Sequence, residues 1–584
     1  MRSNPATPAV RWCALGRTTG GDFEALAHHA DGTASGPTPI PVGDLAGFVA
    51  TLERDHAPRW VWQSSAAVYP QLLSAGVRVE RCHDLRLCHQ ILRNSQYVAD
   101  RSALAAATQW IATPASEDIS AADSGPALFD LDALPRGHNQ PATLADALSE
   151  YDRQRAAVNG SSHPGRLSLL LAAESAGALI AAELAAAGIP WDAAEHDRIL
   201  TRALGPRPAS YADKPALLAA AGARVREALG DPLLSLDSPP KLLRALRAAG
   251  IQTSSTSQWE LAEHSHPALG PLFEYKKLSR LLTANGWAWL DEWVRMGRYR
   301  PVYIPGGVVT GRWASNGGGA LQLPRVLRPA LRADPGWTLV IADVSQLEPR
   351  VLAAMSGDTA MAAAGRDTDL YSGIVATSTI ANRDDAKIAM LGAMYGATSG
   401  ESGRLVPQLR RVFPRAMGLV DGAADIGERG GTVTTWLGRS SPEADLDWRE
   451  AQSQASMPGA TPQDEQIARR SARERGRFTR NFVVQGTAAE WALAWLAEIR
   501  KQLASFPESE HSPSAESSGP VFSRRPHLAF FLHDEIIVHT PANQAAQVAE
   551  VVQAAAAAAG NLLFPGGAVD FRLDLHITDR ATKQ

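Results

Sequence analysis

Three short segments carry side chains whose types and spacing could support phosphoryl transfer. The segment "LVIADVSQLEPRVLAAM", residues 339 to 355, is an apolar strand-like run that ends at Asp343, and a helical pattern containing Glu348 follows. The segment "HLAFFLHDEIIVH" has two apolar strand-forming runs that meet at His533 and Asp534, which predicts a tight hairpin. Both patterns place a carboxylate beyond a strand end, where it can project into a cleft without being buried.

Asp343 and Asp534 are natural partners in such a cleft. Two carboxylates that share a site repel each other unless a cation lies between them. A pair of Mg²⁺ ions roughly 4 Å apart satisfies both carboxylates and suits phosphoryl transfer. We therefore expect Asp343 and Asp534 to hold two Mg²⁺ ions, with Mn²⁺ as a possible substitute.

The third segment, "RDDAKIAMLGAMYG", repeats functional side chains every four residues. Arg383, Lys387, Leu391 and Tyr395 therefore line one stripe of a predicted helix. A guanidinium and an ammonium one turn apart suit a chain of phosphates, because both donate to oxyanions. Taken alone, the stripe also fits a solvated helix with a partly buried tyrosine.

The elements that position these residues come in blocks along the chain. Residues 1–150 predict a small mixed domain, with a linker rich in Ser, Asp, Pro and Gly over 112–141. Helical periodicity starts near residue 166 and continues to about 296. Strand signals dominate from 301 to 342.

Helices are expected from about 345 to 500, and a strand pair at 528–539. The intervening segment 506–526 has the composition of a disordered insertion. Blocks of elements, rather than a steady alternation of strands and helices, favour an α+β plan over a doubly wound sheet.

Length and composition set broad limits. A chain of 584 residues exceeds one compact core, and no apolar run of membrane-spanning length or secretory signal is apparent. The three cysteines fit a reducing compartment, so we expect a cytoplasmic protein. Two arginine clusters could neutralise phosphates or form solvated faces balanced by nearby acids. They comprise Arg295, Arg298, Arg300, Arg312, Arg325, Arg328 and Arg332, and Arg469, Arg470, Arg473, Arg475, Arg477 and Arg480.

Together these residues resemble a known family, the family A DNA polymerases related to bacterial DNA polymerase I. "DVSQLEPR" resembles its motif A, "RDDAKIAMLGAMYG" its motif B and "HDE" its motif C. "TGRWASNGGGALQLP" resembles its primer-template contact segment and "RFTRNFVVQGTAAE" a helix near the template and minor groove. "SLDSPPKLLRALRAAGI" and "FEYKKLSRLL" resemble the thumb. The resemblance covers about residues 166–584, with no 5′-nuclease domain ahead of it.

The resemblance implies a right-hand polymerase fold. The thumb would span about 200–300, the palm about 301–370 and 485–584, and the fingers about 371–484. An exonuclease-like (RNase H-like) α/β domain would occupy 1–150.

The resemblance also assigns roles. Asp343 and Asp534 would hold the metals with the backbone of Val344, and Arg383 and Lys387 would stabilise the charge that develops as pyrophosphate departs. Glu348 would exclude a ribose 2′-OH as a steric gate. The nucleotide site would also include Leu391, Tyr395, Gln346 and Tyr371. DNA contacts would come from Arg312, Gln322, Arg477, Asn481, Gln485, His533, Tyr395 and Gly396, with Glu535 in support.

Four positions depart from the family pattern. Leu391 stands where Phe or Tyr is usual beside the sugar, which leads us to expect altered discrimination at the 3′ position. Val344 replaces a usual Tyr and Pro349 a usual Leu, which is tolerable in the first turn of a helix. Tyr371 replaces a His that often assists the triphosphate, and a phenol cannot carry positive charge near neutral pH.

The amino-terminal domain lacks the acids of a 3′-5′ exonuclease. The sequence Asp22-x-Glu24 follows "TTGG" rather than ending an apolar strand, and "WVWQSSAAVYPQLL" has no second metal acid. The segments at 77–93 and 150–158 resemble structural parts of that fold. Because two-metal hydrolysis tolerates ligand loss poorly, we expect an inactive exonuclease.

The resulting prediction is a monomeric DNA polymerase that binds primer-template DNA and dNTPs, acts in replication or repair gap filling, and does not associate with membranes. In a bacterium it would be associated with the nucleoid. Two alternatives stay open: a catalytically silent primer-template binding protein, and a single-subunit RNA polymerase, which shares the Asp, Lys, Tyr and His-Asp positions.

Overall fold

The computed structural model describes residues 8–111, 142–316, 318–319, 323–366, 368–397 and 400–581. Contacts divide the chain into two compact units. The first comprises Met1–Gly188, Val302–Asn316 and Pro335–Thr578, and the second Ile189–Pro301, Gly317–Asp334 and Asp579–Gln584. The expected linker at 112–141 lies outside the described residues.

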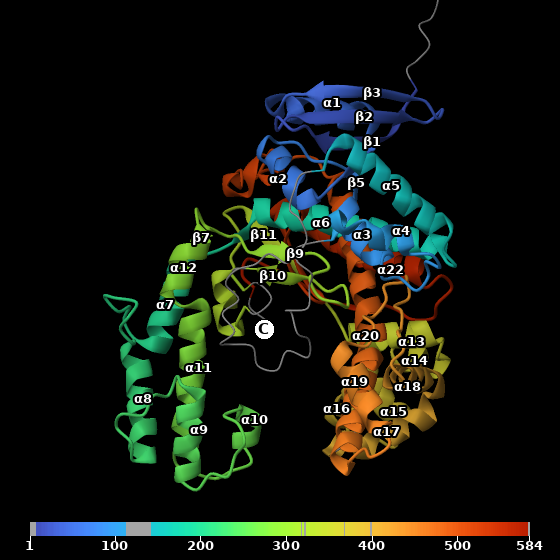
Figure 1. The fold of residues 1–584 in the computed structure, drawn as a ribbon. Helices are drawn as coiled ribbons and strands as arrows, with labels where there is room; N and C mark the ends of the chain where they lie inside the picture. Colours follow the sequence, from blue (N-terminus) through green and yellow to red (C-terminus); the bar gives the residue numbers. More distant parts are fainter. Residues whose placement is uncertain are drawn as a thin grey trace, which may run out of the picture. The chain divides into compact units, whose positions relative to one another are not determined.

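A five-stranded mixed sheet organises the start of the first unit (Figure 1). Its strands are β1 (Val10–Arg17), β2 (Phe23–His29), β3 (Ala34–Ile40), β4 (Arg59–Trp62) and β5 (Arg81–Asp84). They lie in the order β3-β2-β1-β4-β5, with β1 antiparallel to β2 and parallel to β4. This mixed sheet agrees with the small mixed domain expected over residues 1–150, and its assignment as RNase H-like stays a prediction. The accompanying helices are α1 (Leu45–His56), α2 (Ser65–Ser74), α3 (Leu85–Leu92), α4 (Ser102–Ala106) and α5 (Leu144–Asn159).

The apolar helix α6 (Pro164–Ala187) follows and is capped at its end by Gly188. Its mean hydropathy reaches 1.6 over 18 residues, enough by length and composition to span a membrane. The expectation that no apolar run reaches this length is therefore wrong. Of that stretch 67% is buried, because α6 packs against α2 and β5 and against the long helix α20 (Pro462–Leu503).

A four-stranded antiparallel sheet carries the predicted strand-end acids. Its strands are β11 (Trp337–Val344), β12 (His527–Leu532), β13 (Glu535–Pro541) and β14 (Leu573–Thr578), in the order β12-β13-β11-β14. Helix α22 (Ala545–Leu563) packs against β11, β13 and β14. The hairpin predicted at 528–539 is confirmed. A separate two-stranded ribbon pairs β9 (Val302–Ile304) with β10 (Ala314–Asn316).

Helices between β11 and β12 build a second apolar core around residues such as Met390, Phe413 and Phe482. They are α13 (Leu347–Ser356), α14 (Thr359–Ala364), α15 (Leu370–Thr377), α16 (Arg383–Tyr395), α17 (Gly400–Val412), α18 (Pro414–Glu428), α19 (Leu446–Ala455) and α20. Helix α20 has 42 residues and begins with a capping box in which Thr461 and Asp464 bond reciprocally. It packs against α18 and α22.

The second unit is mainly helical. Its helices are α7 (Ala193–Leu204), α8 (Ala216–Leu229), α9 (Pro239–Ala248), α10 (Gln258–Leu261), α11 (Leu269–Asn285) and α12 (Trp287–Trp293). A small sheet joins β6 (Ile189–Pro190), β8 (Arg298–Tyr299) and β7 (Val294–Arg295). This unit contains the range expected for a thumb, and the division into thumb, palm and fingers stays a prediction.

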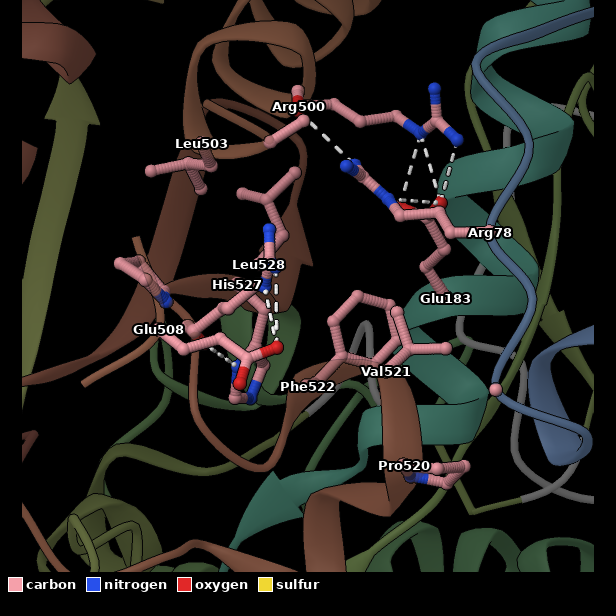
Figure 2. A pocket seen from close by; sticks show the side chains of 14 residues that line it. Arg78, Glu183, Arg500, Leu503, Glu508, Pro520, Val521, Phe522, His527 and Leu528 are labelled. Atoms are coloured by element: carbon pink, nitrogen blue, oxygen red, sulfur yellow. Dashed lines mark hydrogen bonds and ion pairs between the residues drawn. The ribbon is translucent and has the colours of Figure 1, made fainter. Parts of the chain in front are cut away.

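The segment at 506–526 is ordered, so the expectation of disorder is wrong. Phe506 and Phe522 are buried, the carbonyl of Pro513 accepts a hydrogen bond from the Trp337 indole at 2.7 Å, and α21 (Gly519–Phe522) packs against α2. Its polar composition concealed these few apolar anchors. Beside it, Arg78 and Arg500 converge on Glu183 at a cavity of about 210 Å³ (Figure 2).

Candidate active site

The two predicted metal carboxylates meet where strand β11 ends. Asp343 lies opposite Glu535 of β13, and the Val344 N–H donates to the backbone carbonyl of Asp534 at 2.9 Å. Asp534 belongs to the tight turn between β12 and β13, which His533 enters with a left-handed φ of 58°. The strand-end placement expected from the sequence is therefore confirmed. The expectation that the carboxylate escapes burial is wrong for Asp534, which is half-buried, and Glu535 at the start of β13 is buried.

The electrostatics of this corner favour a cation. Burial and then the charge of Asp343 raise the pKa of Asp534 to about 6, while burial and Arg312 lower the pKa of His533 to about 4. Carboxylate and backbone oxygens are the ligands that Mg²⁺ prefers. No three His, Cys, Asp or Glu side chains in the described part of the chain are close enough together to hold a metal ion. The two carboxylates, backbone oxygen such as that of Val344, water and substrate phosphates would therefore share the coordination of Mg²⁺.

Glu348 stands in the first turn of α13 and is held from two sides. Arg312 forms an ion pair with one carboxylate oxygen, and the Tyr395 hydroxyl donates to the other at 2.8 Å. The Glu348 side chain is only 12% exposed. Glu348, the expected steric gate, is thus bonded to Arg312, an expected DNA contact, and to Tyr395 at the end of α16. Sequence spacing did not reveal these contacts.

The predicted stripe on α16 is confirmed. Arg383, Lys387 and Tyr395 are exposed and Leu391 is half-buried, whereas the opposite face of the helix, with Ala389 and Met390, is buried. The charged groups of Arg383 and Lys387 therefore lie at the protein surface, where a ligand can reach them, and not in the core.

Asp369 is a functional candidate that the sequence analysis missed. It caps α15, accepts two hydrogen bonds from Arg383, and accepts one from the amide of Gln346 at 2.9 Å. The Arg383 guanidinium also lies over the ring of Tyr371, 5.5 Å from its centre. The Asp-x-x-Ser spacing of Asp369 and Ser372, a helix-capping pattern, was the only available signal.

Two of the expected DNA-contacting residues on α20 are buried polar groups. Asn481 and Gln485 are 3% and 7% exposed, and their side-chain oxygens have no hydrogen-bond partner within the described residues. Arg477 is partly exposed and packs beside Gly396, where an added Cβ would meet its side chain at 2.8 Å. Gln322 lies outside the described residues.

A buried ionic cluster behind Arg312 was also missed. Arg439 pairs with Glu174, and its guanidinium passes so close to Gly311 that an added Cβ would lie 2.5 Å from Nε. Nearby Glu490 accepts hydrogen bonds from the Thr435 hydroxyl and the Leu437 N–H. The cluster supports the backbone that presents Arg312, and its members are too far apart in sequence to form a motif.

In the amino-terminal sheet, the two acids of the Asp-x-Glu sequence lie at the start of β2. Asp22 precedes β2 and accepts a hydrogen bond from the Val42 N–H, and Glu24 lies on β2. The adjoining β1 packs against α5: Ala14 and Leu144 share an apolar cluster, and a Cβ on Gly16 would lie 2.0 Å from the Leu144 nitrogen.

Comparisons with known proteins bear on the family and the fold of this chain. The profile of DNA polymerase family A matches residues 225–580, more than half of the chain. The DNA polymerase I of Chloroflexus aurantiacus is 28% identical over 348 residues, covering 55% of this chain and 33% of that protein. The thermostable DNA polymerase I of Thermus thermophilus is 27% identical, covering 52% and 36%.

The chain thus spans about a third of the length of these relatives. A solved structure, the POL domain of Pol1 from M. smegmatis in complex with DNA primer-template and dNTP, matches with a TM-score of 0.65 and 17% identity. The alignment covers 98% of this chain and 95% of that one, and shows the fold. By its profile match and the order of its three motifs, this chain belongs to DNA polymerase family A.

Proposed function

We propose that this protein is a template-directed DNA polymerase that adds deoxynucleotides to a primer 3′-OH. The observation that carries the proposal is the corner where Asp343 and Asp534 share one site, so closely that the charge of one raises the pKa of the other. Binding DNA alone does not require such a pair of carboxylates. The family match and the names of the relatives support the same activity.

The remaining site residues suit this reaction. Asp343 and Asp534 would hold two Mg²⁺ ions, which lower the pKa of the primer hydroxyl and neutralise phosphate charge. Lys387 and Arg383 donate to phosphate oxygens and stabilise the charge that develops on pyrophosphate. Glu348, fixed by Arg312 and Tyr395, fills the space a 2′-OH would need.

We also propose that the amino-terminal domain does not cut DNA. The placement of the two acids of the Asp22-x-Glu24 sequence supports this, because Asp22 is held by the Val42 N–H just before β2 and only Glu24 lies within β2. A role in replication or gap repair, a monomeric state and a cytoplasmic location belong to the same proposal.

Primer extension tests the activity. Purified protein is given a recessed DNA primer, dNTPs and Mg²⁺, and is compared with Asp534→Ala and with Glu550→Ala, which removes an exposed carboxylate from α22. We expect extension by wild type and Glu550→Ala only. DNA binding without extension by wild type would favour the silent binding protein, and primer-independent use of ribonucleotides would favour an RNA polymerase. Trimming of an unpaired primer end would refute the silent exonuclease.

A further inference from the structure

Asp369 occupies the edge of Arg383 that would otherwise face a phosphate. Its Oδ1 accepts from Arg383 Nε at 3.1 Å, and its Oδ2 accepts from Nη2 at 2.9 Å. This fork-to-fork geometry is the one an arginine also uses for two oxygens of a phosphate. The carboxylate raises the pKa of Arg383 through these hydrogen bonds and offsets its charge.

Asp369 does not depend on Arg383 to stay in place. Oδ1 also accepts from the Ser372 N–H at 2.9 Å and the Ser372 hydroxyl at 3.0 Å, and Oδ2 accepts from the Gln346 amide at 2.9 Å. If Arg383 moved away, both carboxylate oxygens would therefore keep partners. The fixed member of the pair is the aspartate, and the movable member is the arginine.

Arg383 is placed to move. Its side chain is 51% exposed, against 28% for Asp369, and an exposed ion pair is weakly held because water competes for both groups. Its guanidinium lies over the Tyr371 ring, so that ring can support the cation without the carboxylate.

We propose that Asp369 is a positioning residue that competes with the incoming triphosphate for Arg383. In the ligand-free protein Asp369 holds the guanidinium in a neutralised pair. A triphosphate must replace this carboxylate as the acceptor of the Nε and Nη2 hydrogen bonds before it can interact with the full positive charge of Arg383. The inference rests on the proposed function, because it takes the triphosphate to be the ligand of Arg383.

Asp369→Asn is the direct test. Asparagine is an equally good helix cap, so α15 should remain intact while the competing charge is lost. We expect the KM for dNTP to fall about fivefold, the order expected for removing one charge several ångströms from the phosphates. The kcat should change by less than about twofold, because Asp369 is not expected to touch the reacting atoms.

Two controls separate competition from a general loss of charge. Asp384→Asn removes a carboxylate next to Arg383 on the same helix turn, without a hydrogen bond to it, and should leave KM within about twofold. In an Arg383→Gln background, Asp369→Asn should lose most of its effect. A full fivefold effect there, or an equal effect of Asp384→Asn, would overturn the proposal, as would a rise in KM.

Isothermal titration with inorganic tripolyphosphate makes the test independent of catalysis. We expect Asp369→Asn to bind this probe about fivefold more tightly than wild type and Asp384→Asn to match wild type. If wild type fails to extend a primer but this difference is found, the proposed function fails and the competition stands. If wild type extends a primer and the variants bind alike, with circular dichroism unchanged, the competition is refuted and the function stands.

Discussion

Glu183→Gln should destabilise the first unit more than any surface substitution. Glu183 accepts hydrogen bonds from Arg500 Nη2 at 2.7 Å and from Arg78 Nε at 3.1 Å (Figure 2). It also accepts a hydrogen bond from the Tyr69 hydroxyl at 2.7 Å. The Glu183 and Arg500 side chains are each 7% exposed. Glutamine keeps the shape of the side chain but leaves two guanidiniums without their shared counter-charge.

The magnitude follows from the pKa of Glu183. Burial alone would raise this pKa, but Arg500 and then Arg78 outweigh burial and lower it from 4.5 to about 2. At 1.36 kcal/mol per pKa unit, this difference corresponds to about 3 kcal/mol of stability, the range measured when a buried pair is broken. This contribution of the ionised Glu183 to the free energy of unfolding is complete above pH 4.5 and is lost as pH falls towards 2.

Urea unfolding followed by tryptophan fluorescence measures this effect, because Trp60 and Trp62 are buried in the amino-terminal sheet. The transition that exposes them is fitted separately, since a chain of two units need not unfold in one step. The control is Glu498→Gln. The Glu498 carboxylate lies 3.6 Å from the Lys501 ammonium on α20, and this substitution should lower the free energy of unfolding by under about 1 kcal/mol. Equal losses for both variants, or an unchanged difference between wild type and Glu183→Gln on acidification, would refute the reasoning.

Three further predictions concern the proposed polymerase site and its support. Burial, opposed by the Thr435 hydrogen bond, raises the pKa of Glu490 to about 7. Relative to Glu490→Gln, the free energy of unfolding of wild type should therefore be greatest below pH 4.5 and fall by about 3 kcal/mol as pH rises from 4.5 through 7. Urea unfolding of both proteins across this pH range measures the change, and a constant difference between them would contradict the prediction. Glu348→Ala should reduce discrimination against ribonucleotides by at least about tenfold in single-nucleotide extension, whereas Glu348→Gln keeps the shape and should retain discrimination. Leu391→Phe should change the ratio of dideoxynucleotide to deoxynucleotide incorporation, and an unchanged ratio would show that packing at Leu391 does not govern the 3′ position.

Local patterns in the sequence were enough to predict the elements that carry the chemistry. Apolar runs that end in Asp343 and meet at Asp534 predicted the strand end and the hairpin, because alternation and turn chemistry act over a few residues. The four-residue repeat from Arg383 to Tyr395 predicted one exposed helical stripe for the same reason. The family resemblance then supplied roles for these residues.

Only the tertiary structure revealed which side chains meet. Asp369 and Arg383 are 14 positions apart, Arg312 and Glu348 are 36 apart, and Glu183 and Arg500 are 317 apart, so no local periodicity links either member to the other. The sequence by itself therefore determined the strands, helices and candidate acids. Folding decided which charges are paired, shared or buried, because ion pairing depends on distance in space and on exclusion of water.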